Sequence, residues 1–104
     1  MSIKKQFLKS RPSCKVTFRL SKEAAKDAKN VFLVGEFNGW DCSVSPMKPL
    51  KTGDFTTTVE LSIEQPEYQF RYLCDDAHWE NDCEADAYIP NGIDGDNSVV
   101  RLQQ

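Results

Sequence analysis

The chain has 104 residues and a mass of 11.8 kDa, which is enough for one compact domain and too little for a second. A core of this size leaves no space for the deep catalytic cavity of a large enzyme such as a barrel hydrolase. Hydrophobic residues make up 39% and charged residues 28% of the chain, as in folded domains and unlike disordered ones. The formal net charge of -3 argues against nucleic acid or an anionic membrane as a partner, because no large positive field would attract either.

The charges are unevenly distributed along the chain. Residues 1–22 carry seven basic side chains and no acid, whereas residues 75–96 carry eight acids and no Lys or Arg. We expect both runs to be solvated surface, and a basic tail that contacts nucleic acid is the alternative. The expected organisation is a basic N-terminal leader at residues 1–12, followed by a single domain at residues 13–104.

The apolar segments are shorter than the roughly 20 residues that a membrane span needs, and the polar start MSIKKQ lacks the apolar segment of a signal peptide. These observations predict a cytoplasmic protein with no membrane partner. The cysteines include no pair spaced as in a zinc knuckle or a redox CxxC motif. We therefore expect no metal site, no cofactor and, in a reducing compartment, no disulfide. The cysteines are Cys14, Cys42, Cys74 and Cys83.

Apolar and polar residues alternate from Lys15 onward, which indicates β-strands, and no segment keeps helical spacing for three turns. The first predicted strand, residues 15–20, hides one face and exposes the other. Residues 21–30 are rich in Ala and Lys, and we expect at most one helical turn there. The continuous apolar run of residues 31–35 is typical of a central strand that is buried on both sides.

The second half of the chain continues this pattern. Two prolines restrict residues 46–50 to a short edge strand, and residues 55–61 alternate as a half-buried strand. Residues 68–74 are predicted to form a strand, followed by a short strand around Trp79, a long polar loop and a last strand at residues 98–102. Six or seven short strands predict an all-β domain built as a two-sheet sandwich. In the strand at 68–74, the inward residues are Tyr68, Phe70, Tyr72 and Cys74, and the outward ones are Gln69, Arg71 and Leu73.

Residues suited to catalysis are scarce. The one histidine, His78, stands beside a turn, and neither GxSxG nor GxxxxGK occurs. The acids of residues 75–96 lie in a polar segment, whereas glycoside hydrolysis needs a buried acid that faces a second carboxylate across a cleft. The DGDN segment at residues 94–97 lacks the further oxygen ligands of a calcium loop. We therefore predict no enzymatic activity, no catalytic residues and no bound metal.

The two tryptophans are the informative residues, because each stands among polar neighbours. Trp40 follows Phe37-Asn38-Gly39 on a predicted loop, and Trp79 lies between His78 and Glu80. Two indole rings in view of solvent are costly unless something stacks on them. The C–H face of a sugar ring is a natural stacking partner. The alternative is that one or both rings fold back as lids on the core.

Six blocks stand in order along the chain: VTFRL (16–20), VFLVGEFNGWD (31–41), PM (46–47), YQFRYLCDD (68–76), WEND (79–82) and DNSVV (96–100). In order and spacing they resemble the family-48 carbohydrate-binding modules. These domains precede the catalytic barrel in isoamylases and branching enzymes and form the glycogen-binding domain of the AMP-activated protein kinase beta subunit. The leader KKQFLKSRPSCKVTFRL is similar to the start of small stand-alone bacterial members. The resemblance implies an immunoglobulin-like β-sandwich of the early-set type, with about seven strands, which binds α-1,4-linked glucan without activity of its own.

The resemblance also implies which residues contact the sugar. In glycogen-binding members, the Trp that ends the FN-x-W block and the Trp after the next hairpin stack on glucose rings, and here they correspond to Trp40 and Trp79. The basic residue of the YQFRY strand, Arg71, corresponds to one that hydrogen-bonds sugar hydroxyls. The acid–amide pair before the last strand corresponds to Asp96 and Asn97, with the register between the two left open. Capping of the turn is the alternative role for Asn97.

Two loops depart from the family pattern. Asp75-Asp76 stands where relatives usually have Asp-Gly, and residues 91–95 lack the Gly-rich form of a loop that contacts sugar in glycogen binders. The leading hypothesis is a non-catalytic module that binds glycogen or a maltooligosaccharide through the two tryptophans, with a glycogen-metabolising enzyme as a further partner. The alternative is a protein-interaction scaffold of glycogen metabolism in which the same face docks a protein and has no affinity for sugar.

Overall fold

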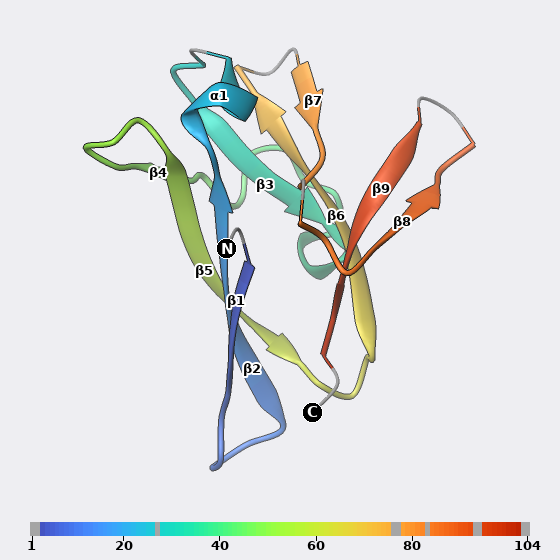
Figure 1. Ribbon diagram of the computed structural model, residues 1–104. Coiled ribbons are helices and arrows are strands. Elements are labelled where there is room, and N and C mark those ends of the chain that lie inside the picture. Colours follow the sequence, from blue (N-terminus) through green and yellow to red (C-terminus); the bar gives the residue numbers. More distant parts are fainter. Residues whose placement is uncertain (1–2, 27, 76–77, 83, 93–94, 103–104) are drawn as a thin grey trace.

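The computed structural model describes residues 3–26, 28–75, 78–82, 84–92 and 95–102 (Figure 1). Over these residues the chain forms nine strands, one turn of α-helix and one turn of 3-10 helix. In chain order they are β1 (Ile3–Phe7), β2 (Ser13–Leu20), α1 (Lys22–Ala25), β3 (Val31–Gly35), η1 (Glu36–Asn38), β4 (Lys48–Pro49), β5 (Phe55–Ser62), β6 (Glu67–Cys74), β7 (His78–Glu80), β8 (Ala87–Pro90) and β9 (Asp96–Arg101).

The strands build two antiparallel sheets that pack face to face. The first sheet has the order β1-β2-β5-β4, and the second has the order β3-β6-β9-β8, with β7 also paired to β6. The predicted all-β, immunoglobulin-like sandwich is therefore confirmed. The described residues hold nine strands instead of about seven, because β1 and β8 add to those that the alternation predicts. The helical turn expected within residues 21–30 is α1, which is capped by a hydrogen bond from the Ala24 N–H to Ser21 Oγ at 3.1 Å.

Aromatic rings from both sheets form the centre of the core. Phe18 of β2 and Phe70 of β6 are fully buried, and their ring centroids lie 4.9 Å apart in an edge-to-face arrangement. Phe70 also packs against Tyr72 at 5.6 Å. Each such pair contributes roughly 0.5–1.5 kcal/mol beyond the burial of its area. The inward residues predicted for β6 are all buried, and so the alternation in the sequence identified the core face of this strand.

Strand β3 corrects one prediction, because it does not lie in the centre of its sheet. It pairs with β6 on one side only. On the other side the structure describes a single bridge, Phe32 to Pro46, flanked by hydrogen bonds from Leu33 N–H to Ser45 O and from Met47 N–H to Val31 O. The apolar run of β3 is explained by the burial of both faces of this strand. The central strand is β6, which contacts β3, β7 and β9.

Residues 3–7, which the sequence analysis assigns to the leader, form the edge strand β1. Each of its residues is in register with one of β2, and Ile3 is buried in the core. Lys5 lies on the same face of the strand as Ile3, and its ammonium is 2.7 Å from Asp86 Oδ2, just before β8. This ion pair joins the first sheet to the second at an open side of the sandwich. An inward-pointing charge on an edge strand also discourages pairing with another chain.

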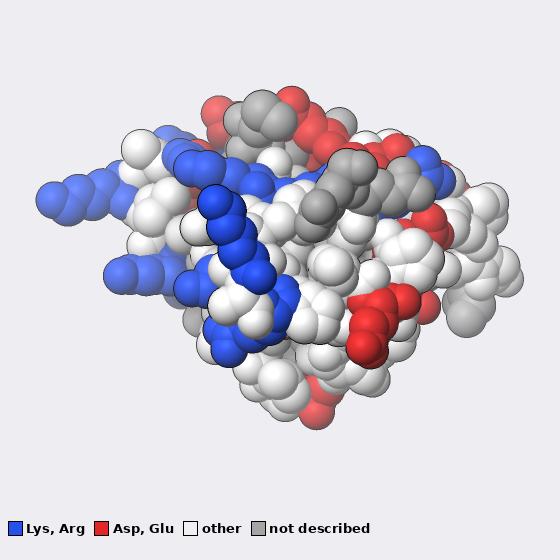
Figure 2. All heavy atoms as spheres, turned by 90° about the horizontal axis from the view of Figure 1, so that it is seen from below, with Lys and Arg blue, Asp and Glu red and all other residues white. Residues whose placement is uncertain are grey.

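The charge asymmetry of the sequence reappears on the surface. Lys15 and Arg19 of β2 are exposed on the outer face of the first sheet, as are Lys4 of β1 and Lys48 of β4. Figure 2 shows most Lys and Arg atoms gathered on one side of the molecule, with Asp and Glu mainly on the other side and along the top. In the described part of the chain, no helix is long and apolar enough to cross a membrane.

The cysteines offer a direct test of the packing. Cys42 is exposed, whereas Cys14 and Cys74 are buried. Burial, with the nearby charges of Glu80 and Asp75, raises the pKa of Cys74 to about 11, and burial also raises the pKa of Cys14. In a Cys83→Ser chain, iodoacetamide at pH 8 should label one cysteine rapidly and two only in denaturant, because the reactive species is the thiolate. Mass spectrometry of the labelled peptides checks this, and rapid labelling of Cys74 in the native protein would contradict the packing of β6.

The ion pair between Lys5 and Asp86 predicts a pH dependence of stability. Burial raises the pKa of Asp86, but hydrogen bonds from the Arg101 N–H and from Lys5 Nζ outweigh it, so the pKa is lower than usual. A carboxylate with a lowered folded pKa stabilises the protein above its unfolded pKa, near 4, and loses this contribution as the pH falls through the folded value.

We therefore expect Asp86→Asn to cost about 0.2–1 kcal/mol of unfolding free energy at pH 7, as for other partly exposed pairs. Urea titrations of variant and wild type should converge as the pH falls below the lowered folded pKa of Asp86, because the wild-type carboxylate is then protonated. Glu64→Gln, at an exposed position with no ion pair among the described residues, is the control and should leave the pH profile unchanged. A constant difference between wild type and Asp86→Asn at all pH values would contradict the assignment.

Candidate functional site

The outer face of the second sheet carries a second apolar layer, separate from the core. Val34, Leu73 and Val99 are 0%, 5% and 0% exposed, yet none of them belongs to the cluster of residues between the two sheets. Their registers place them on the face that points away from the core, where Val34 lies opposite Arg71 and Leu73 lies opposite Trp79. Leu73 was predicted to face outward and does so, but it is buried because side chains of this outer layer cover it. The polar and aromatic residues of this face therefore stand on a packed floor.

Arg71 and Trp79 form a stacked pair on this face. The Arg71 guanidinium carbon Cζ lies 5.1 Å from the centroid of the Trp79 ring, within the range of a cation–π interaction. Both side chains are half-buried. Such a contact is worth roughly 0.5–2 kcal/mol, depending on how far it is desolvated. It orients the indole and the guanidinium relative to each other. The outward position predicted for Arg71 is confirmed, whereas its contact with Trp79 was not predicted.

The two residues after β7 anchor Trp79. Asp82 is only 1% exposed, and its carboxylate accepts hydrogen bonds from the Tyr72 hydroxyl at 2.7 Å and from the Glu84 N–H at 2.8 Å. The Asp82 N–H donates to Ser98 Oγ at 2.9 Å, and Ser98 Oγ in turn donates to Asn81 Oδ1 at 2.8 Å. The strand that carries Trp79 is thereby tied to both β6 and β9. Two residues of the WEND block, Asn81 and Asp82, therefore have structural roles, because their side chains hold this segment in place.

Asn38 organises the loop that carries Trp40. Its Oδ1 accepts the Gly35 N–H at 3.0 Å, while its Nδ2 donates to Leu33 O at 2.9 Å and to Ser45 Oγ at 3.2 Å. The neighbouring Phe37 ring packs towards the core, 5.9 Å from the Phe18 ring centroid. Phe37 therefore anchors the loop in the core, and Asn38 joins the two ends of the loop.

Trp40 is displayed at the end of this turn. Its φ is 60°, in the left-handed region, and the Trp40 N–H donates to Gly35 O at 2.9 Å. A bulky residue in this region costs on the order of 1–3 kcal/mol unless its surroundings enforce it, and such residues cluster at functional sites. The indole is 38% exposed. Gly35 adjoins Val34, the partner of Arg71 in the β3–β6 register, so the loop that carries Trp40 begins at the end of β3, one residue past the partner of Arg71.

Asn97 joins the same face through a polar network. Arg71 and Asn97 each come one residue past the Phe70–Ser98 pair of the β6–β9 ladder. Asn97 is 8% exposed, its Nδ2 donates to Gln69 Oε1 at 3.0 Å, and its Oδ1 accepts from Asn91 Nδ2 at 3.2 Å. The Gln69 N–H donates to Glu36 Oε1 at 2.7 Å, which links this network to η1.

Asp96 is not brought together with the other predicted site residues. Because side chains alternate along β9, Asp96 belongs to the opposite face of the strand from Asn97, and it is exposed there. Its described contact is at the backbone, where its carbonyl accepts from Asn81 Nδ2 at 2.9 Å. The pairing of β9 therefore places Asn97, and not Asp96, on the face of Arg71 and Trp79.

The structure describes only part of the two loops that depart from the family pattern, residues 75–76 and 91–95. Asp75 has a φ of 53°, and its Oδ1 accepts the N–H groups of Lys29 and Asn30, both at 2.9 Å. Asp76 lies outside the described residues, as do residues 93–94 of the second loop and Cys83. At the ends of the second loop, the Asn91 N–H donates to Gly95 O at 2.8 Å.

The sequence analysis missed the supporting residues Asn38, Asn81 and Asp82, although two of the quoted blocks contain them. Among the described residues, no group of three or more His, Cys, Asp or Glu side chains could hold a metal ion. The outer face instead offers the Trp79 indole, the Arg71 guanidinium and the Asn97 amide on a packed floor, and the exposed Trp40 indole stands on the loop that follows β3. Such a surface suits a flat, polar ligand whose C–H groups stack on the rings and whose hydroxyls meet the polar groups.

Comparison with known proteins agrees with this geometry. A search of curated proteins found no match. The family model of carbohydrate-binding module 48, also described as the isoamylase N-terminal domain, matches residues 11–89, which extend from just before β2 almost to the end of β8. The match includes the tryptophan loop, the Arg71 strand and the Trp79 strand. The chain therefore belongs to the carbohydrate-binding module 48 family.

Proposed function

We propose that this chain is a non-catalytic module that binds α-1,4-linked glucan, glycogen or a maltooligosaccharide, on the outer face of its second sheet. Trp40 and Trp79 would stack on glucose rings, and Arg71 and Asn97 would hydrogen-bond the sugar hydroxyls. Asp96 is left out because it belongs to the other face of β9. The observation that carries the proposal is the stacked Arg71–Trp79 pair on the packed outer face, in a member of a carbohydrate-binding family. The left-handed, 38% exposed Trp40 on the loop that follows β3 adds a second indole.

The chemistry of the face fits a sugar better than an apolar ligand. The indole rings offer flat surfaces, while the guanidinium of Arg71 and the amide of Asn97 suit hydroxyls. Arg71 already holds Trp79, and Asn38 already holds the Trp40 loop, so little conformational entropy remains to be lost on binding.

The binding of a single chain should nevertheless be weak. Two stacking contacts and a few solvated hydrogen bonds correspond to about -4 to -6 kcal/mol, or a Kd on the order of 0.05–1 mM. A branched glucan presents many chain ends. Its repeated sites would raise the apparent affinity if the module is attached to a further binding unit.

Removing the rings tests the proposal. Native gel electrophoresis through glycogen should retard the wild-type chain and not Trp40→Ala/Trp79→Ala, because the sugar loses both stacking surfaces. Each single variant should retain part of the retardation. The matched control is Val44→Ala, which shortens another exposed apolar side chain close to Trp40 in sequence without removing a ring.

Thermal unfolding separates this outcome from misfolding. We expect Trp40→Ala to change the unfolding free energy by no more than about 0.5 kcal/mol, as is usual for surface positions. Equal mobility of the wild type with and without glycogen would contradict glucan binding. If a protein were then captured that maltooligosaccharide does not displace, the scaffold role would be favoured.

Asn38 should matter for binding although it is not proposed to touch sugar. Asn38→Ala removes three hydrogen bonds and leaves buried backbone groups without their partner, so it should lower the unfolding free energy by about 1–3 kcal/mol. In a Trp79→Phe background, the fluorescence of Trp40 should move to longer wavelength, and retardation by glycogen should weaken at a temperature where the variant is folded. Ser43→Ala is the control on the same loop and loses only its bond to Asp41. Full retardation of Asn38→Ala would show that the loop need not be preformed.

A further inference from the structure

A pocket of about 390 Å³ opens at the end of the sandwich where α1 meets the turn between β4 and β5. Three separate segments build it: α1, the residues just before β3, and the β4–β5 turn. Its volume lies within the range of small-molecule sites. None of the four residues that we propose to contact glucan lines it. The lining residues are Lys22, Ala25, Ala28, Lys29, Pro49, Lys51, Thr52, Gly53 and Phe55.

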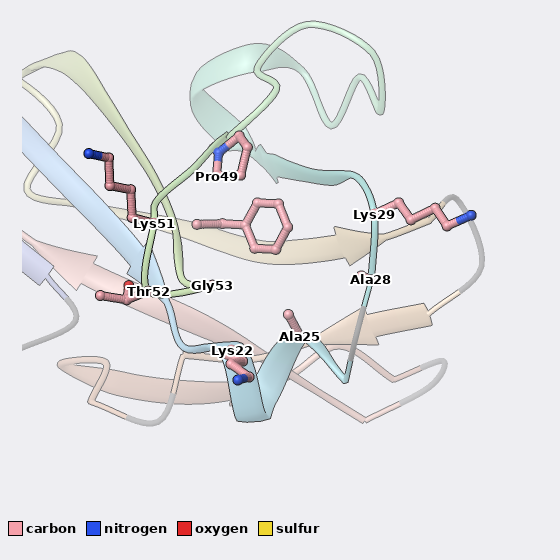
Figure 3. Close-up of a pocket in the computed structure, with 9 residues that line it drawn as sticks. Lys22, Ala25, Ala28, Lys29, Pro49, Lys51, Thr52 and Gly53 are labelled. Carbon is pink, nitrogen blue, oxygen red and sulfur yellow. The ribbon is translucent and has the colours of Figure 1, made fainter.

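The pocket combines an apolar floor with a cationic rim. Phe55 and Ala25 are buried in the core, and Ala28 and Pro49 add further apolar surface. Figure 3 shows the lysines on different sides of the opening, with Lys22 on the helical turn and with Lys29 and Lys51 opposite each other, their ammonium groups turned outward. All three are exposed, and their long stems can turn the ammonium groups over the opening.

The lysines of this rim form no ion pair within the described part of the chain. No described carboxylate lies within ion-pair distance of the three lysine ammonium groups. The neighbouring acid, Asp54, accepts the Lys22 backbone N–H at 2.8 Å through Oδ1, and its Oδ2 is 2.8 Å from Arg19 Nη2. These two bonds and the charge of Lys22 lower the pKa of Asp54. Three cations around one opening favour an anion of two charges over a neutral ligand.

The wall formed by Gly53 also shapes the pocket. Gly53 has a φ of 96°, and a Cβ atom there would lie 2.8 Å from Lys22 Cδ. The stem of Lys22 therefore lies directly against the turn, which places the lysine at the edge of the opening. The Thr52 hydroxyl is exposed beside it and can bond a ligand hydroxyl.

We propose that this pocket is a second ligand site, which binds the phosphate monoester of a hexose. The phosphate meets the three lysines, and the C–H face of the sugar ring packs on the apolar floor. The phosphate can belong to a free sugar phosphate or to a phosphorylated residue of a glucan chain, since both present the same chemistry. The site is independent of the proposed glucan face.

Isothermal titration calorimetry of the full chain with glucose 6-phosphate tests this site. We expect saturable binding with a Kd on the order of 1 mM at low ionic strength. Lys22→Gln/Lys29→Gln/Lys51→Gln should weaken it at least about tenfold, through loss of charge-assisted contacts. The matched control, Lys4→Gln/Lys9→Gln/Lys15→Gln, removes the same charge at sites that do not line the pocket and should keep the affinity. Ala28→Leu keeps all the charges but fills the pocket, and it should also weaken binding.

Further experiments distinguish this pocket from the glucan face, and a free sugar phosphate from a phosphate on a glucan chain. Trp40→Ala/Trp79→Ala should bind glucose 6-phosphate as the wild type does, so loss of glucan binding would leave this result unaffected. In that background, a phosphorylated maltodextrin should bind if the phosphate can be borne by a chain, and the same material after phosphatase treatment should not. The proposal is overturned if glucose 6-phosphate shows no saturable binding, if inorganic phosphate binds equally well, if both lysine triples weaken binding equally, or if the double tryptophan variant loses it.

Discussion

The two-sided packing of strand β6 is the constraint on which the fold and the proposed site both depend. Inward, Phe70 and Tyr72 are fully buried in the core. Outward, Arg71 and Leu73 lie in register with Val34 and Trp79 of the neighbouring strands. Because side chains alternate along a strand, a slip of one residue would expose the core rings and bury Arg71. The geometry of the candidate face is therefore set by the same register that stabilises the domain.

Side-chain hydrogen bonds hold the segments that carry the two tryptophans. Asn38 joins both ends of the Trp40 loop, and buried Asp82 ties the Trp79 strand to β6 and β9. A preformed aromatic surface needs little ordering when a ligand arrives, which favours binding even where each contact is weak. The hydrogen bonds of Asn38 also keep Trp40 in its strained, left-handed backbone conformation. A loop without them would relax to a more favourable conformation.

The amino-acid sequence predicts the strands of the sandwich well where apolar and polar residues alternate regularly, as in β5 and β6. It predicts them less well where contacts between distant residues determine the position of a strand. Strand β1 escapes a pattern-based prediction because Lys5 occupies an inward position, where it pairs with Asp86, which is distant in the sequence. The apolar run of β3 cannot distinguish a central strand from one whose two faces are both covered. The candidate site residues follow from a family resemblance, and the pairing of β9 is needed to show that Asn97, and not Asp96, shares the face of Arg71. The supporting bonds of Asp82 reach Ser98, 16 residues away, which no local pattern reveals.

The most direct test of the glucan face is a titration of the ¹⁵N-labelled chain with maltoheptaose, followed by nuclear magnetic resonance. The account predicts that the indole N–H signals of Trp40 and Trp79, the Arg71 guanidinium and the Asn97 amide shift together with a single Kd on the order of 0.05–1 mM. Signals of the opposite sheet, such as the backbone N–H of Thr17, should remain in place. If the two indole signals do not move at saturating maltoheptaose, or if the shifts gather on the β1-β2-β5-β4 sheet, the account is contradicted.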